Sequence, residues 1–162
     1  MATWTDVTAA APEIATLTQD RIEATGLALL ATLRRDGFPR LSGIEPSFAD
    51  GEIWLGMMPR SLKALDLLRD PRMTLHNATV DKDVKEGDVK ITGRAVAMTD
   101  RDVLERFRQA TKEKTDFDPG TDFHLFTVDV LEVSTLRPAP DQSYLIIDVW
   151  KVGTAPRRIE RR

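Results

Sequence analysis

Three polar residues at the start of a leucine-rich segment have the types and spacing of an anion-binding turn. Arg60, Ser61 and Lys63 follow residues 53–58, which alternate like a strand, and precede an amphipathic run that predicts a helix. The first N–H groups of a helix have no intrahelical partner, and the helix dipole favours negative charge at that end. The turn therefore favours binding of a phosphate, such as that of a cofactor. The alternative is an ordinary helix N-cap beside two solvated bases.

Signatures of other chemistries do not occur in the sequence. It contains no GxGxxG, GxxxxGK[ST] or HExxH motif, no nucleophile elbow, no cysteine, and only two histidines, His76 and His124. A lone histidine in an alternating strand is more often packed or hydrogen-bonded than a metal ligand. We therefore predict no metal site and assign no catalytic side chain.

Composition limits the class of protein and its partners. With 162 residues, 41% hydrophobic and 30% charged, the chain reads as one globular domain, residues 1–162. A formal net charge of −3 and a pI of about 5.4 argue against a nucleic-acid partner. No apolar run is long enough to cross a bilayer, and the first residues lack a secretory signal pattern. We expect a cytoplasmic protein with neither a nucleic-acid nor a membrane partner.

The N-terminal third predicts a helix followed by a strand meander. Residues 12–25 read as a helix that Gly26 ends, whereas residues 1–11 read as a loose segment. The apolar run 27–33 and the segment 39–48 predict two strands of a hairpin.

The next elements lead into the candidate turn. Strict alternation fails in the second strand, which suggests a β-bulge near Gly43. Residues 53–58 predict a third strand, and a helix should begin near Ser61 and end at Asp70 and Pro71. The apolar face expected to be buried by that helix consists of Leu62, Leu65 and Leu68.

The remainder alternates strands with one more helix. Strands are predicted at 73–78, 89–98, 124–136 and 144–151, and a helix over 99–114. About seven strands and three helices with mostly hairpin connections favour a mainly β (α+β) fold, an antiparallel barrel with peripheral helices. The basic tail, residues 152–162, reads as a solvated, frayed terminus, although its arginines could reach a phosphate.

A series of short motifs follows a recognisable order along the chain. They are LLATL at 29–33, DGFPRLS at 36–42, DGEIWLG at 50–56, RSxK at 60–63, LRDPR at 68–72, KITGRA at 90–95 and VW at 149–150. Each motif is weak alone, and their joint order carries the comparison. Together they resemble the pyridoxamine 5′-phosphate oxidase-like split-barrel flavoproteins over roughly residues 11–162.

The resemblance implies a split barrel that forms a homodimer, with two cofactor sites at the subunit interface. It implies that Arg60, Ser61 and Lys63 bind the cofactor phosphate. It further implies that a flavin-type ring is bordered by Arg40, Leu41, Ser42, Met57 and Met58, for which the alternative is barrel packing. The chain departs from the family pattern at Gly43 and Glu45, and it lacks the C-terminal motif of true pyridoxamine-phosphate oxidases.

The activity implied is that of an oxidoreductase that moves hydride to or from a small organic substrate with FMN. A deazaflavin, coenzyme F420, is the alternative cofactor at the same site. Non-catalytic binding of flavin or haem is a second alternative, and a dimeric scaffold that binds nothing is a third. Haem is the less expected because only two histidines are present.

Overall fold

The computed structural model describes residues 1–79 and 81–162 and contains nine strands and four helices in that part of the chain. The mainly β composition predicted from the sequence is confirmed, with two more strands and one more helix than expected. In chain order the elements are α1 (Trp4–Ala10), α2 (Pro12–Glu23), β1 (Ala28–Leu33), β2 (Pro39–Ile44), β3 (Ser47–Ala49), β4 (Glu52–Met57), α3 (Leu62–Arg69), β5 (Arg72–Asn77), β6 (Asp88–Met98), α4 (Arg101–Thr115), β7 (His124–Pro138), β8 (Leu145–Lys151) and β9 (Arg157–Arg161).

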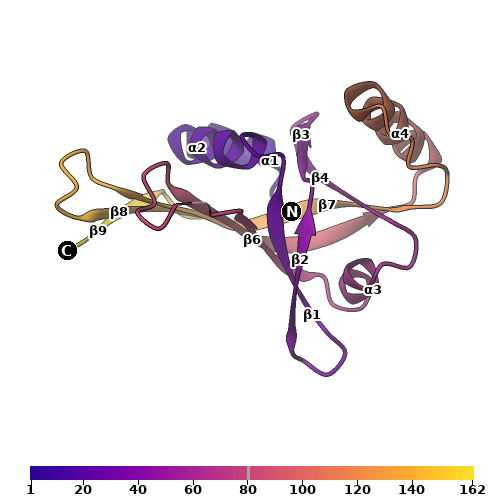
Figure 1. Cartoon of the computed structure of the whole chain (residues 1–162), viewed down its shortest axis with the longest axis horizontal. Coiled ribbons are helices and arrows are strands. Elements are labelled where there is room, and N and C mark those ends of the chain that lie inside the picture. Colours follow the sequence, from indigo (N-terminus) through magenta and orange to yellow (C-terminus); the bar gives the residue numbers. More distant parts are fainter. Residues whose placement is uncertain (80) are drawn as a thin grey trace.

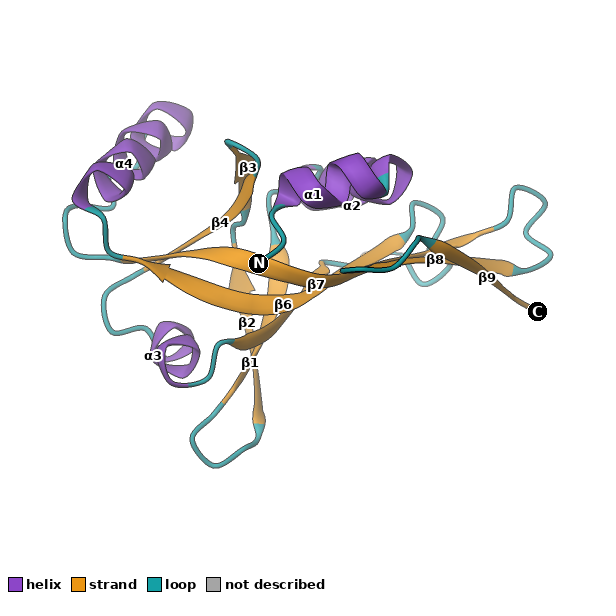
Figure 2. Ribbon diagram, turned by 180° about the vertical axis from the view of Figure 1, so that it is seen from behind, coloured by secondary structure: helices purple, strands orange, loops and turns teal. Residues whose placement is uncertain are grey.

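All strand pairs are antiparallel, in the order β2-β1-β5-β6-β7-β4-β3, with β8 and β9 extending from β7. Figure 1 shows α1 and α2 above the long strands, α3 below them, and α4 at the end opposite the C-terminal strands. The reverse view shows the same arrangement (Figure 2). This is the predicted antiparallel split barrel with peripheral helices.

Strand alternation places the core. In β4, Ile53, Leu55 and Met57 are buried, as the two-residue period predicts. They join the apolar faces of β1, β5, β6 and β7 in one hydrophobic cluster. None of the helices in the described residues has the length and apolarity needed to span a membrane.

The predicted bulge near Gly43 is wrong. The register of β1 with β2 is unbroken from the pair Ala28 and Ile44 to the pair Leu33 and Pro39. The predicted strand 39–48 divides into β2 and β3 because Pro46, which has no N–H to donate to a ladder, lies between them. The register shift occurs instead between Thr92 and Gly93, where β6 pairs with β7.

Gly93 is required at this bulge by close packing. A Cβ there would lie 2.4 Å from the carbonyl oxygen of Asp129 and 2.9 Å from Cγ1 of Val128. We expect Gly93→Ala to lower the free energy of unfolding by about 1–3 kcal/mol, measured by urea denaturation. Gly43→Ala is the control, because a Cβ at Gly43 would have no heavy atom within 4 Å. Equal losses in the two variants would contradict this explanation.

The first residues are not loose. Thr3 and Asp6 form a reciprocal capping box at the start of α1, and Trp4 and Val7 are buried beneath it. The N–H of Val130 donates to the carbonyl of Ala2, which ties the segment to β7. A helix of seven residues is too short to show a clear period in the sequence, and the sequence therefore did not predict it. Because so short a helix is not stable alone in water, tertiary contacts stabilise it.

The basic tail is not frayed either. β9 pairs with β8 from Arg157 to Arg161, and Arg158 donates through Nε to Oδ1 of Asp148 at 2.6 Å. The partner carboxylate lies on another strand, so the charges of the tail gave no local indication of pairing.

Candidate anion-binding site at the start of α3

A tight turn connects β4 to α3. The N–H of Ser61 donates to the carbonyl of Met58 at 3.2 Å, so Pro59 and Arg60 are the two central residues. Arg60 has φ of 56°, and a proline followed by a residue of positive φ is the pattern of a type II turn. Glycine is the usual residue at that second position, so an arginine there is unusual. Such backbone outliers cluster at binding sites.

Donors gather where α3 begins. Ser61 is the N-cap in an extended conformation, but its hydroxyl makes no capping bond; Oγ is buried and has no partner among the described residues. The N–H of Leu65 makes the first helical bond, to the carbonyl of Ser61, so the N–H groups of residues 62–64 precede it. A buried hydroxyl without a partner is costly unless something else satisfies it.

Lys63 connects this helix start to β2. Its Nζ donates to the carbonyl oxygen of Gly43 at 2.6 Å. Burial lowers the pKa of the Lys63 ammonium, and the nearby charge of Glu45 opposes that shift. Lys63 therefore stands between the turn and the strand on which Arg40, Leu41 and Ser42 lie.

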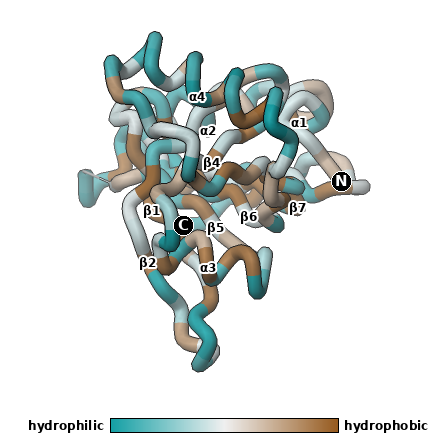
Figure 3. Tube along the Cα trace, turned by 90° about the vertical axis from the view of Figure 1, so that its right-hand side faces the viewer, coloured by the Kyte–Doolittle hydropathy of each residue, from teal (hydrophilic) through white to brown (hydrophobic). Residues whose placement is uncertain are grey.

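The buried face of α3 differs from the prediction. Leu62, Leu65 and Leu68 are 59%, 44% and 53% exposed, whereas Ala64, Asp66 and Leu67 are buried. The apolar stripe of α3 thus lies on the surface. Figure 3 shows brown, hydrophobic segments of the tube beside the α3 label. The prediction was wrong because the hydrophobic pattern favours burial of the face with Leu62, Leu65 and Leu68. The face that is buried instead carries an aspartate, Asp66.

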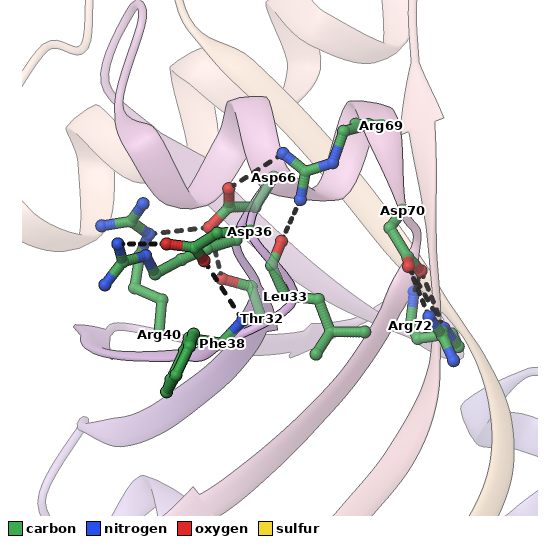
Figure 4. A network of polar contacts seen from close by, with 10 residues as sticks. Thr32, Leu33, Asp36, Phe38, Arg40, Asp66, Arg69, Asp70 and Arg72 are labelled. Atoms are coloured by element: carbon green, nitrogen blue, oxygen red, sulfur yellow. Dashed lines mark hydrogen bonds and ion pairs between the residues drawn. The ribbon is translucent and has the colours of Figure 1, made fainter.

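Asp66 explains why that face is buried. Its Oδ2 accepts from Nε of Arg40 at 2.7 Å and from the hydroxyl of Thr32 at 2.9 Å, and its Oδ1 accepts from Arg69 at 3.3 Å. Figure 4 shows these side chains converging from β1, β2 and α3, with Arg69 also reaching the carbonyl of Leu33. The network fixes α3 against the β1–β2 hairpin and orients Arg40.

Burial of the Asp66 carboxyl acts to raise its pKa, but the opposing interactions outweigh burial. Hydrogen bonds from Arg40, Thr32 and Arg69, together with the charge of Arg40, hold the pKa of Asp66 below its ordinary value. The carboxylate is therefore charged at neutral pH. Asp66, Thr32 and Arg69 were missed by the sequence prediction because no local motif distinguishes them.

The predicted site residues divide into those near the turn and those elsewhere. Arg60, Ser61 and Lys63 lie together at the start of α3, and Arg40 is tied to that helix through Asp66. Leu41 and Met58 are 66% and 74% exposed, and Ser42 is half-buried on β2. Met57 is 4% exposed and belongs to the core, so its side chain is not available to a ligand.

The residues of the turn and of the Asp66 network, with Glu45, carry more positive than negative charge. Arg40, Arg60, Lys63 and Arg69 carry four positive charges and Glu45 and Asp66 two negative charges, a sum of +2. The chain as a whole carries −3. A positive region on an acidic protein favours an anionic ligand at this place.

A comparison of the sequence with models of protein families shows the family of this chain. A family model for pyridoxamine 5′-phosphate oxidase matches residues 15–137, which include every residue of the turn, of α3 and of the Asp66 network. The chain belongs to the pyridoxamine 5′-phosphate oxidase family. Among curated proteins no sequence matches it significantly.

Solved structures share the fold of this family. A protein related to general stress protein 26, from Clostridium acetobutylicum, is 14% identical with a TM-score of 0.61, over 91% of this chain and 96% of that one. A conserved hypothetical protein from Mycobacterium tuberculosis is 23% identical with a TM-score of 0.62, over 77% and 82%. A heme-binding protein from Mycobacterium smegmatis is 18% identical with a TM-score of 0.60, over 83% of this chain and 57% of that one. These likenesses show the split-barrel fold.

Proposed function

We propose that this protein is an FMN-dependent oxidoreductase that binds the FMN phosphate at the turn between β4 and α3. The observation that carries the proposal is the Ser61 hydroxyl, which is buried, unpartnered among the described residues and placed at a helix N-cap between Arg60 and Lys63. A phosphate oxygen would give that hydroxyl its missing partner. Arg60 and Lys63 would supply charge-assisted hydrogen bonds.

The donor set fits a phosphate monoester. Such a dianion needs several donors, and the residues at the start of α3 carry a hydroxyl, an ammonium, a guanidinium and the N–H groups of residues 62–64. Arg40 adds its terminal nitrogens, which donate to no other described residue once Nε is bound to Asp66. The bond to Asp66 fixes the orientation of the Arg40 guanidinium.

Exposed apolar residues on β2 and at the end of β4 suit a flat ring. Leu41 and Met58 would border it together with the half-buried Ser42, and Met57 would support the strand end from within the core. When bound, FMN supplies hydride transfer to or from a small organic substrate, and the protein binds, orients and excludes water. The chain's own residues hold the phosphate and present an apolar surface to the ring.

Haem is the less favoured ligand because the sequence has only two histidines, His76 and His124, and Nε2 of His124 accepts from the N–H of Arg60. Coenzyme F420 also carries a phosphate, so it competes with FMN for the same donors. The absorbance spectrum of the protein purified without added cofactor distinguishes these ligands. Flavin bands support the proposal, whereas a deazaflavin band or a Soret band would contradict it.

We further propose a homodimer. Leu62, Leu65 and Leu68 form an exposed apolar stripe on α3, and Leu41 on β2 and Met58 after β4 are exposed as well. Exposed apolar surface of this kind marks an interaction site, and a second copy of the chain would cover it beside the cofactor. Light scattering measures the mass of the protein in solution. The mass of a monomer would contradict the proposed homodimer.

Ser61 allows binding to be separated from folding. Ser61→Ala removes no hydrogen bond from the protein alone, so we expect the free energy of unfolding to change by less than about 0.5 kcal/mol. FMN binding should weaken about fivefold because one hydrogen bond of about 1 kcal/mol is lost. Calorimetric titration with FMN, and with riboflavin as the control that has no phosphate, measures this. Unchanged FMN affinity would exclude Ser61 from the phosphate site.

A further inference from the structure

A histidine from β7 contacts the backbone of the candidate turn. His124 is the first residue of β7 and pairs with Met57, the last residue of β4. The turn that follows β4 lies beside the imidazole of His124. The N–H of Arg60 donates to Nε2 of His124 at 3.3 Å. The neutral imidazole that accepts at Nε2 carries its proton on Nδ1.

This bond is made by the one residue of the turn whose backbone conformation is unfavourable. Arg60 has φ of 56°, a region that side chains other than glycine avoid. The bond from Ser61 N–H to the Met58 carbonyl closes the turn but leaves the Arg60 peptide itself unbound. The imidazole of His124 supplies an acceptor for that peptide.

The imidazole is held in place by its surroundings. It is half-buried, and its ring lies nearly parallel to that of Phe126, with centroids 6.4 Å apart and an angle of 29° between the planes. Phe126 is in the core and 1% exposed. The imidazole of His124 is thus an acceptor fixed to the sheet. It can hold the conformation of the turn at Arg60, which lies outside the sheet.

We propose that His124 is a positioning residue that holds Arg60 in its left-handed conformation, so that Arg60 and Ser61 present their donors to the phosphate together. The proposal rests on the proposed binding of FMN at this turn. His124 touches the peptide of Arg60 and acts through it, without contacting the phosphate itself. It extends the site to β7, which lies outside the strand-turn-helix segment that the sequence motif marks.

The test compares an acceptor with a side chain that cannot accept. His124→Gln places an amide oxygen near the position of Nε2, whereas His124→Leu fills a similar volume without an acceptor. We expect His124→Leu to weaken FMN binding about fivefold to tenfold, the effect of one hydrogen bond, and to change riboflavin binding less than twofold. His124→Gln should stay within about twofold of the wild type for both ligands. His76→Leu is the matched control and should also stay within twofold.

The outcomes separate this proposal from the function on which it rests. If the wild type binds no FMN, the proposed function fails. If the wild type binds FMN but His124→Leu binds it equally well, or loses FMN and riboflavin to the same extent, the positioning role of His124 is overturned. If His124→Leu does not fold, His124→Asn, whose shorter amide does not reach the Arg60 N–H, replaces it. Hydrogen exchange at the Arg60 amide reports the bond without any flavin. It should be slow in the wild type and in His124→Gln, and fast in His124→Leu or in the His124→Asn that replaces it.

Discussion

Replacing both Arg60 and Lys63 with alanine is expected to weaken FMN binding about 100-fold. A hydrogen bond to a charged group contributes about 1.5 kcal/mol or more, so the loss of two amounts to about 3 kcal/mol, and each 1.4 kcal/mol is a factor of ten. Riboflavin has no phosphate and should lose less than about threefold. Calorimetric titration of the double variant with both ligands measures the two effects.

The fold should survive this double substitution. Lys63 donates to the carbonyl of Gly43, so a loss of about 1 kcal/mol in the free energy of unfolding is expected from that contact. Arg157→Ala combined with Arg161→Ala is the control, because it removes the same charge from β9 and should leave FMN binding unchanged. If the β9 variant weakens FMN binding as much, the effect is one of net charge and the turn is not the site.

Asp66→Asn is expected to lower the free energy of unfolding by about 3–5 kcal/mol. The carboxylate is 4% exposed and binds Arg40, Thr32 and Arg69, so its neutralisation leaves two guanidinium groups without their counter-charge. Asp70→Asn is the matched control, since Asp70 pairs with the exposed Arg72 in the same part of the molecule (Figure 4). A much smaller loss is expected there. Urea denaturation measures both.

The contribution of Asp66 also has a defined dependence on pH. Its pKa in the folded protein lies below the ordinary value of 3.8, so the unfolded chain binds the proton more readily. The stabilisation is therefore complete above about pH 4 to 5 and is lost as the pH falls through the lowered folded pKa. The difference in stability between the wild type and Asp66→Asn should shrink over that acid range. A constant difference down to pH 2 would show that the charge of Asp66 is not what stabilises α3.

Local patterns in the sequence predicted most of the strands. Alternation in residues 53–58 gave the buried face of β4 correctly, and Gly26 ended α2 as expected because it takes a positive φ. Features that depend on a partner in another element were predicted incorrectly. The bulge at Gly93 is set by the backbone of Asp129, which is far away in sequence, and β9 is held by Asp148, which is near in sequence but lies on β8.

The candidate site shows the same division. The strand, the turn and the helix start lie within ten residues, so residue types and spacing were sufficient to mark Arg60, Ser61 and Lys63. The orientation of α3 was predicted incorrectly because three leucines dominate its hydrophobic pattern, while the ion pair of Asp66 with Arg40 decides which side is buried. His124 contacts the turn from 64 residues away, and no local pattern indicates that contact.

The central claim is that the turn between β4 and α3 binds the phosphate of FMN. Titration of the cofactor-free protein with FMN and with riboflavin, followed by quenching of flavin fluorescence, tests it most directly. We predict saturable binding of one FMN per chain, with riboflavin bound at least about tenfold more weakly because the phosphate contacts are missing. Equal affinity for the two flavins, or no saturable binding of FMN, would contradict the claim.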